Sequence, residues 1–210
     1  MNSVDGLLRA APQTTPRART ALALGLGGGA LMGGALGAYS GEPLMAVFAA
    51  IKVPLLLLLS AGLCLPSFYV LNAVLGLRAD LAPALRALLA AQAALGVTLG
   101  ALTPISVFAS LSVHDPYAQT LVDGMLFAVA TFAAQQMLAR HYEPLVARDP
   151  RHLVALRGWL VVYVFTGIQL AWVLRPFRGT AGFPVEFLRP EAFEQNAYLV
   201  VLDHFARLLR

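Results

Sequence analysis

The sequence predicts an all-α membrane protein: a polytopic bundle of about five transmembrane helices, with a short interfacial helix and a C-terminal amphipathic helix. Of the 210 residues, 59% are hydrophobic and only 12% are charged, and the mean hydropathy is +0.72. Soluble domains carry roughly 25% charged residues, so this composition is unsuited to a water-soluble fold. Long runs without charge also alternate with short polar breaks, which is typical of helices that cross a bilayer.

The chain divides into a basic N-terminal segment at residues 1–20, a transmembrane bundle at residues 21–174, and a loop with an amphipathic helix at residues 175–210. The uncharged run at residues 21–40 predicts the first span. It is longer than the apolar region of a signal peptide, which has about 7 to 15 residues. We therefore expect a retained first helix, and a cleaved signal peptide with a small-residue site near Ala38 is the alternative.

Four glycines recur at every fourth position of the first predicted span: Gly25, Gly29, Gly33 and Gly37. On a helix, these positions share one face. A groove of small residues allows another helix backbone to approach closely, and this packing stabilises helix pairs in lipid. We expect this face to be a helix-packing surface. The alternative, a flexible glycine-rich linker, is disfavoured by the leucines between the glycines.

The second uncharged run is interrupted only by Lys52. It covers 34 residues, from Leu44 to Leu77, and as one helix it would reach about 51 Å, well past a hydrocarbon core of roughly 30 Å. We therefore predict a short interfacial or re-entrant helix at residues 44–51, followed by a span at residues 53–75. In this division Pro54 lies in the first turn of the span, where proline is tolerated, and Pro66 is expected to kink it.

Three further spans are predicted at residues 85–110, 117–138 and 153–174. The fourth span begins after the pair Asp115 and Pro116, which is typical of a helix start. It ends at a basic, hydrophilic segment at residues 140–157. The tail from residue 191 has apolar residues at spacings of three and four, which predicts an amphipathic surface helix. A sixth crossing by this tail is the alternative.

The distribution of basic residues predicts the orientation. With five spans, the N-terminus and two of the loops share one side of the membrane. The loops on that side hold six arginines, whereas the loops on the other side hold only Lys52. The positive-inside rule then places the N-terminus in the cytoplasm. A composition rich in Ala, Leu and Arg, with one lysine in the whole chain, favours a bacterial inner (plasma) membrane.

Few polar side chains interrupt the predicted spans. Asp123 and Gln135 lie in the fourth span, and Gln169 lies in the fifth. Intramembrane polar residues are functional candidates because their burial in lipid is costly. These three could line a polar path for a proton or a solute. The alternative is that the amides bind helices to one another and that Asp123 is close enough to the membrane surface to be hydrated.

The sequence contains no recognisable catalytic or metal-binding motif. Cys64 is the only cysteine, which excludes an intramolecular disulfide and a cysteine-based metal site, and the four histidines are not spaced as helical metal ligands. Serine-hydrolase, zinc-protease and phosphate-loop motifs are absent. We therefore expect no enzymatic activity, no metal and no cofactor. The net charge of +4 is explained by membrane orientation rather than by nucleic-acid binding.

The string at residues 169–177, Gln-Leu-Ala-Trp-Val-Leu-Arg-Pro-Phe, predicts a defined corner at the membrane surface. Trp172, Arg175 and Phe177 are expected to contact lipid or a partner there, because a guanidinium can bind a lipid phosphate or a carboxylate. Together with the proline-containing segment at residues 52–72, this string resembles those of uncharacterised bacterial inner-membrane proteins of similar length. The resemblance implies a polytopic fold and carries no activity.

Two functions are expected. The first is a non-catalytic subunit or assembly scaffold of a larger inner-membrane complex, with membrane lipids and other membrane subunits or copies of itself as partners. The second is a small transporter or channel element with a polar path through Asp123 and the intramembrane glutamines. The glycine groove, the short loops and the lack of a catalytic motif favour the first.

Overall fold

The computed structural model describes residues 15–113, 115–175, 177–178, 185–189 and 192. In this part of the chain all regular structure is helical. The long helices are α2 (Thr15–Ala38), α3 (Pro43–Val74), α4 (Leu81–Ser112), α5 (Pro116–Arg148) and α6 (Arg151–Leu174), and a short 3-10 turn, η1 (Arg78–Asp80), joins α3 to α4. These five helices are long and apolar enough to cross a membrane. The all-α class and the multi-pass architecture are thereby confirmed.

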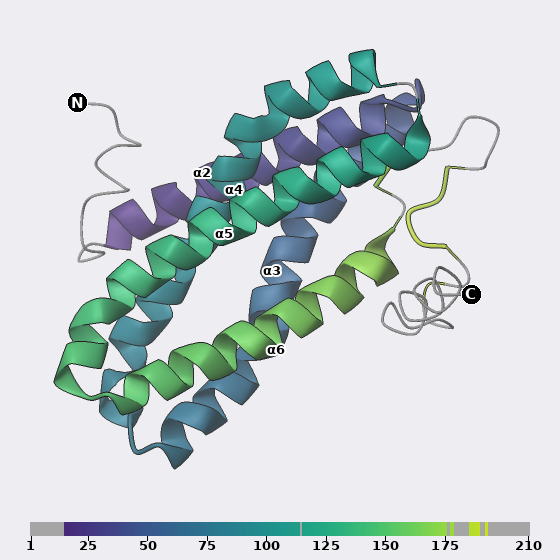
Figure 1. The fold of residues 1–210 in the computed structure, drawn as a ribbon. Coiled ribbons are helices and arrows are strands. Elements are labelled where there is room, and N and C mark those ends of the chain that lie inside the picture. The colour runs from purple at the N-terminus through teal and green to yellow at the C-terminus, as the bar shows by residue number, and fades with distance from the viewer. Residues whose placement is uncertain (1–14, 114, 176, 179–184, 190–191, 193–210) are drawn as a thin grey trace, which may run out of the picture.

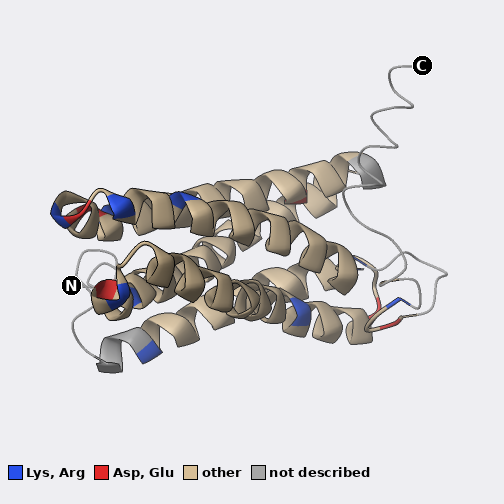
Figure 2. Cartoon of the chain, turned by 90° about the horizontal axis from the view of Figure 1, so that it is seen from below, with Lys and Arg blue, Asp and Glu red and all other residues tan. Residues whose placement is uncertain are grey.

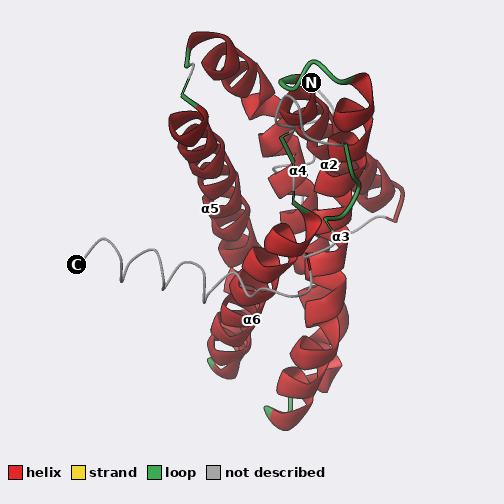
Figure 3. Ribbon diagram, turned by 90° about the vertical axis from the view of Figure 1, so that its right-hand side faces the viewer, coloured by secondary structure: helices red, strands yellow, loops and turns green. Residues whose placement is uncertain are grey.

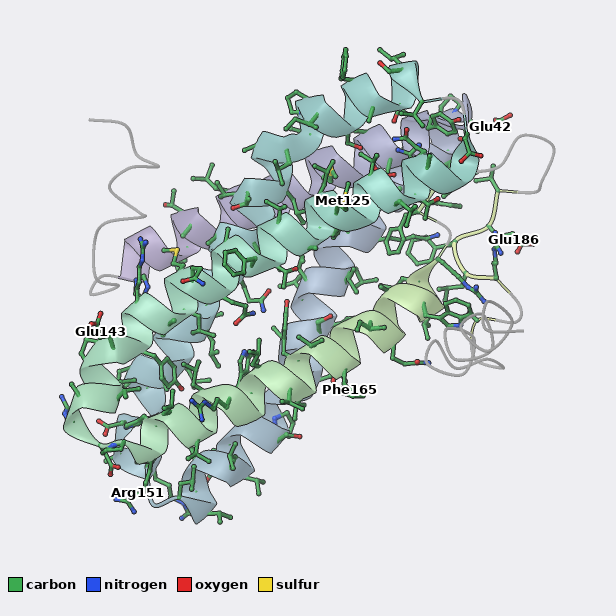
Figure 4. The ribbon with its side chains drawn as sticks, in the orientation of Figure 1. Glu42, Met125, Glu143, Arg151, Phe165 and Glu186 are labelled. Atoms are coloured by element: carbon green, nitrogen blue, oxygen red, sulfur yellow. The ribbon has the colours of Figure 1, made fainter. Side chains whose placement is uncertain are left out.

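The helices run up and down between two ends of the bundle (Figures 1 and 3). End A holds the α2–α3 turn, the α4–α5 turn and the last residues of α6. End B holds the first residues of α2, the α3–α4 turn and the α5–α6 turn. Most of the charged residues lie at these two ends (Figure 2). In Figure 4, Glu42 and Glu186 mark end A, and Glu143 and Arg151 mark end B.

Helix α2 packs against both α3 and α4, while α5 packs on α4 and α6 packs on α3. Two apolar clusters fill the interior. The cluster nearer end A consists of Met32, Leu36, Val53, Leu57, Leu95, Leu99, Leu126, Ala130 and Ala134. The cluster nearer end B consists of Cys64, Phe68, Ala84, Ala87, Leu88, Ala91, Leu138, Tyr142, Leu145, Trp159 and Tyr163. Large apolar side chains on the outside, such as Met125 and Phe165, are exposed as lipid-facing residues would be (Figure 4).

The predicted division of residues 44–75 into two helices is wrong. Helix α3 is continuous over 32 residues, a length of about 48 Å. Pro43 takes the first-turn position that was predicted for Pro54, and Pro54 lies in the helix interior. The helix continues through Lys52 because this side chain is fully buried in the bundle and therefore does not mark a polar break between two helices. A helix longer than the hydrocarbon core is accommodated by tilting or by extending beyond it.

The basic segment at residues 140–157, where the fourth span was predicted to end, is helical except for a two-residue break. Helix α5 continues to Arg148, and α6 begins at Arg151, so only two residues separate them. The continuation of α5 is explained by Leu138, Tyr142 and Leu145, which are buried at helical spacing in the end-B cluster. The predicted C-terminal amphipathic helix from residue 191 and the basic segment before residue 15 lie outside the described residues.

Candidate functional site

The predicted glycine face of α2 lies against two neighbouring helices of the same chain. A Cβ atom added at Gly33 or Gly37 would come under 3.0 Å from backbone atoms of α3, and one added at Gly25 would come equally close to the backbone of Ala93 in α4. Gly29 is less crowded, because its nearest neighbour is the Leu57 side chain at 3.3 Å. These contacts are intramolecular, so the groove is already occupied by α3 and α4.

The closest backbone approach includes a glycine that the four-residue repeat does not contain. Gly28 lies against Gly96 and Gly100 of α4, and a Cβ on any of the three would come under 3.0 Å from the backbone of the other helix. Gly96 and Gly100 are themselves four residues apart, so both helices present small residues at the crossing. A search for paired small-residue spacings on two spans would have identified this contact.

The residues of the 169–177 string contact one another and the bundle. The guanidinium carbon of Arg175 lies 3.4 Å from the ring centroid of Trp172, a cation–π contact. Phe177 packs, partly buried, against the end-A cluster. The ring nitrogen of Trp172 is buried and has no hydrogen-bond partner among the described residues. Phe177 therefore contacts the bundle, and the expected contact of these three residues with lipid or a partner stays a prediction.

Asp123 is the centre of a buried polar cluster near end A. One carboxylate oxygen accepts a hydrogen bond from the Ser106 hydroxyl at 2.9 Å, and the other accepts one from Nε of Arg178 at 2.5 Å. The Asp123 and Arg178 side chains are only 11% and 16% exposed. The cluster is therefore a largely buried ion pair inside a membrane-spanning bundle.

The guanidinium of Arg178 makes further contacts with α4, α5 and the residue after α2. Its Nη2 donates to the Ser110 hydroxyl at 3.0 Å, and with the Gln119 amide turned so that both of its polar atoms are satisfied, the amide oxygen accepts from Nη2 at 2.8 Å. The guanidinium carbon lies 4.6 Å from the ring centroid of Tyr39. Nη1 is buried and has no hydrogen-bond partner in the described part of the chain.

Sequence reasoning identified Asp123 but missed its partners. Arg178 lies 55 residues away in an irregular segment, and no spacing rule connects it to α5. The remaining partners do leave a pattern, since Ser106 and Ser110 are four residues apart on α4, as are Gln119 and Asp123 on α5. Side chains four residues apart share a helix face, so the two polar faces could have been matched across the short α4–α5 turn.

Asp123 and Gln135 of the predicted polar path are not brought together. Gln135 lies twelve residues after Asp123 on α5, about 18 Å along the helix. Between them, the inward face of α5 consists of Leu126, Ala130 and Ala134, which are buried in the end-A cluster. Gln169 lies on α6, where the nearby Gly167 approaches Ser60 of α3. An apolar layer therefore separates Asp123 from Gln135.

Lys52 is a second buried charge of the end-A half. Its side chain has no exposed surface, and its Nζ atom lies 5.3 Å from the ring centroid of Phe187. The Phe187 ring also meets Phe48 of α3 edge-on at 5.3 Å. The described residues that follow α6 are thus held to the bundle at two places, Arg178 on Asp123 and Phe187 over Lys52.

A separate polar cluster joins the two helix turns at end B. Asp80, beside the α3–α4 turn, accepts from Arg148 at 2.7 Å and lies 3.2 Å from Nε2 of the fully buried His152. At the α5–α6 turn, hydrogen bonds from Arg151 lower the pKa of Asp149 from 3.8 to about 2. The contribution of the Asp149–Arg151 pair to stability is complete above the ordinary pKa of the Asp149 carboxyl group, and it is lost as the pH falls toward 2.

Replacing Asp80 with alanine is expected to destabilise the protein by about 1 to 3 kcal/mol, because the buried His152 nitrogen loses its partner. The side chain of Asp80 makes no helix-capping hydrogen bond, so helix α4 itself is unaffected. Equilibrium unfolding in mixed micelles measures the change. Glu143→Ala, an exposed acid near the same end, is the control and should change stability by less than about 0.5 kcal/mol. Equal effects of the two substitutions would contradict a role for Asp80 in joining the turns.

Charged side chains among the described residues form ion pairs in the two polar clusters. No group of three or more His, Cys, Asp or Glu side chains among them is placed to hold a metal ion. Both polar clusters join segments that are distant in the sequence, as shown by Asp80 with His152 and Asp123 with Arg178. No protein-family model, curated protein or solved structure matches this chain.

Proposed function

We propose that this protein is a non-catalytic integral membrane subunit or assembly scaffold of a larger membrane complex. The observation that supports this best is the attachment of the segment after α6 to the bundle by Arg178 on Asp123 and by Phe187 over Lys52. Such attachment fixes the surface of end A, so that a partner meets one defined arrangement of side chains. Its partners would be lipids and other membrane subunits or copies of itself.

The packing of the interior also favours a scaffold. The acid in the fourth span is neutralised by Arg178, and an apolar layer separates it from Gln135. The glycine contacts hold α2 against α3 and α4 over both faces, which makes for a rigid core. A second candidate remains, a small transporter or channel element, because Asp123 and Lys52 are buried charges within spanning helices and such residues commonly mark solute paths.

Co-purification and flux measurements distinguish the two candidates. A tagged copy is purified from its native membranes in mild detergent, and co-purifying subunits are identified by mass spectrometry. Under the scaffold proposal, Arg178→Gln should reduce partner recovery at least about 3-fold, whereas Arg151→Gln at end B should not. Under the transporter candidate, Asp123→Asn should abolish flux in proteoliposomes. Recovery of no subunit or second copy with the wild type would contradict the scaffold.

We propose further that the protein lies in a bacterial inner membrane with end B in the cytoplasm. Seven exposed arginines support this orientation: Arg19, Arg78, Arg86, Arg140, Arg148, Arg151 and Arg157. All lie on the end-B halves of their helices, and basic residues are retained on the cytoplasmic side. At end A, two of the cations, Lys52 and Arg178, are instead buried or paired.

Cysteine labelling in intact cells tests this orientation. In a Cys64→Ala background, Glu42→Cys at end A should react with a membrane-impermeant maleimide from outside. Ala79→Cys at end B should react only after the membrane is opened. Both positions are exposed, so accessibility depends on the side of the membrane alone. The reverse pattern would place the N-terminus outside.

A further inference from the structure

We infer that the polar cluster around Asp123 is a binding site for a small guanidinium cation, and that Arg178 occupies this site in the structure as a tethered ligand. The site, called here the Asp123 site, consists of Asp123, Ser106, Ser110, Gln119 and Tyr39. The inference goes beyond the scaffold proposal, because it assigns a ligand to end A. It would also supply the second candidate function with a substrate class.

The groups of the Asp123 site match the chemistry of a guanidinium ion. A guanidinium presents N–H donors in one plane and a cationic face above and below it. In the plane, the carboxylate of Asp123, the hydroxyl of Ser110 and the amide oxygen of Gln119 accept hydrogen bonds at 2.5, 3.0 and 2.8 Å. On one face lies the ring of Tyr39, 4.6 Å from the guanidinium carbon. Charge, acceptors and aromatic face thus converge on one cation.

The Asp123 site is built without the segment that fills it. Ser106 and Ser110 belong to α4, Gln119 and Asp123 belong to α5, and Tyr39 directly follows α2. Arg178 comes from irregular chain beyond the end of α6. The Ser106 hydroxyl orients the carboxylate through a bond at 2.9 Å that does not involve Arg178. Withdrawal of Arg178 would therefore leave the acceptors in place for a free cation.

The way Arg178 is held indicates that it can be displaced. A fixed structural ion pair is strongest when two N–H groups meet the two carboxylate oxygens in parallel. Here only Nε bonds to the carboxylate of Asp123, and Nη1 is buried without a partner among the described residues. A buried unsatisfied donor costs about 1 to 3 kcal/mol. A free guanidinium ion can rotate in the site and form hydrogen bonds with more of its N–H groups. These bonds would offset the high effective concentration that its covalent attachment gives Arg178.

Equilibrium dialysis of the full chain in detergent with radiolabelled ethylguanidinium tests the inference. Removal of the tethered competitor by Arg178→Ala should tighten binding at least about 10-fold over wild type, since a tethered group competes at an effective concentration of the order of millimolar. The double variant Asp123→Asn with Arg178→Ala should show no saturable binding. Arg151→Ala, which removes an exposed arginine at end B, should bind as the wild type does.

Thermal unfolding provides the second readout. Ethylguanidinium at about ten times its dissociation constant should raise the melting temperature of Arg178→Ala by about 3 to 6 °C, whereas ethylammonium at equal ionic strength should raise it by less than half as much. If Arg178→Ala is poorly folded, Arg178→Gln carries the same test. Absence of tighter binding together with absence of stabilisation would overturn the inference. The binding and melting measurements test only the guanidinium site, and the co-purification experiment tests only the scaffold proposal. The failure of one proposal can therefore be distinguished from the failure of the other.

Discussion

Gly33→Ala is expected to destabilise the bundle by about 3 kcal/mol or more. A Cβ at this position would come under 3.0 Å from the carbonyl oxygen of Ala49 in α3. A backbone atom cannot rotate away as a side chain can, so α2 and α3 must separate along the crossing. Overpacking of a tight interior typically costs about 1 to 3 kcal/mol, and helix separation adds to that value. Equilibrium unfolding in mixed micelles measures it.

Gly27→Ala provides the matched control on the same helix. A Cβ at Gly27 would meet nothing within 4 Å, so no neighbour must move. Alanine also has the higher helix propensity, by about 0.8 to 1.0 kcal/mol in an exposed helix interior. The Gly27 variant should therefore be as stable as the wild type or slightly more stable. Equal losses of unfolding free energy in the Gly33→Ala and Gly27→Ala variants would show that α2 and α3 do not pack closely at Gly33.

Asp123→Asn is expected to destabilise the protein by about 3 to 5 kcal/mol, the amount typical of removing one partner from a buried ion pair. Asparagine has nearly the same shape, so packing is preserved. The substitution removes the negative charge and leaves the guanidinium of Arg178 uncompensated in largely apolar surroundings. Unfolding of the purified protein measures the loss, and increased proteolysis after residue 175 would report release of the segment.

Asp115→Asn is the control for this second prediction. Asp115 lies at the same end of the bundle, where its exposed side chain caps α5 by accepting from the amide of Ala118 at 2.8 Å. Asparagine is about as good a helix cap as aspartate, so stability should change by less than about 0.5 kcal/mol. A comparable loss in both variants would mean that charge at end A, rather than the buried pair, controls stability.

The helices could be predicted from the sequence because their determinants are local. Uncharged runs of sufficient length require helical backbone in lipid, and the polar breaks at residues 41–43 and 115–116 lie at the boundaries between helices in the structure. Helix lengths were less predictable. Lys52 resembles a break in the sequence, yet burial of its side chain in the tertiary structure lets α3 continue through it.

The partners of the predicted site residues were harder to predict, because they depend on contacts between distant segments. The glycine repeat marks a packing face, but no repeat states that Gly25 lies on α4 while Gly33 lies on α3. The pairing of Asp123 with Arg178 depends on how the chain turns after α6. The sequence does not distinguish Arg178 from Arg175 as the partner of Asp123. In the structure, the guanidinium of Arg175 lies over the ring of Trp172.

A double-mutant cycle at Asp123 and Arg178 tests most directly the claim that this pair joins the segment after α6 to the bundle. Unfolding free energies are measured for the wild type, Asp123→Asn, Arg178→Gln and the double variant. We predict that the double variant loses at least about 1 kcal/mol less unfolding free energy than the sum of the losses in the two single variants. In each single variant one charged side chain is left without its partner, whereas in the double variant both charges have been removed. Losses that add within about 0.5 kcal/mol would contradict the pairing.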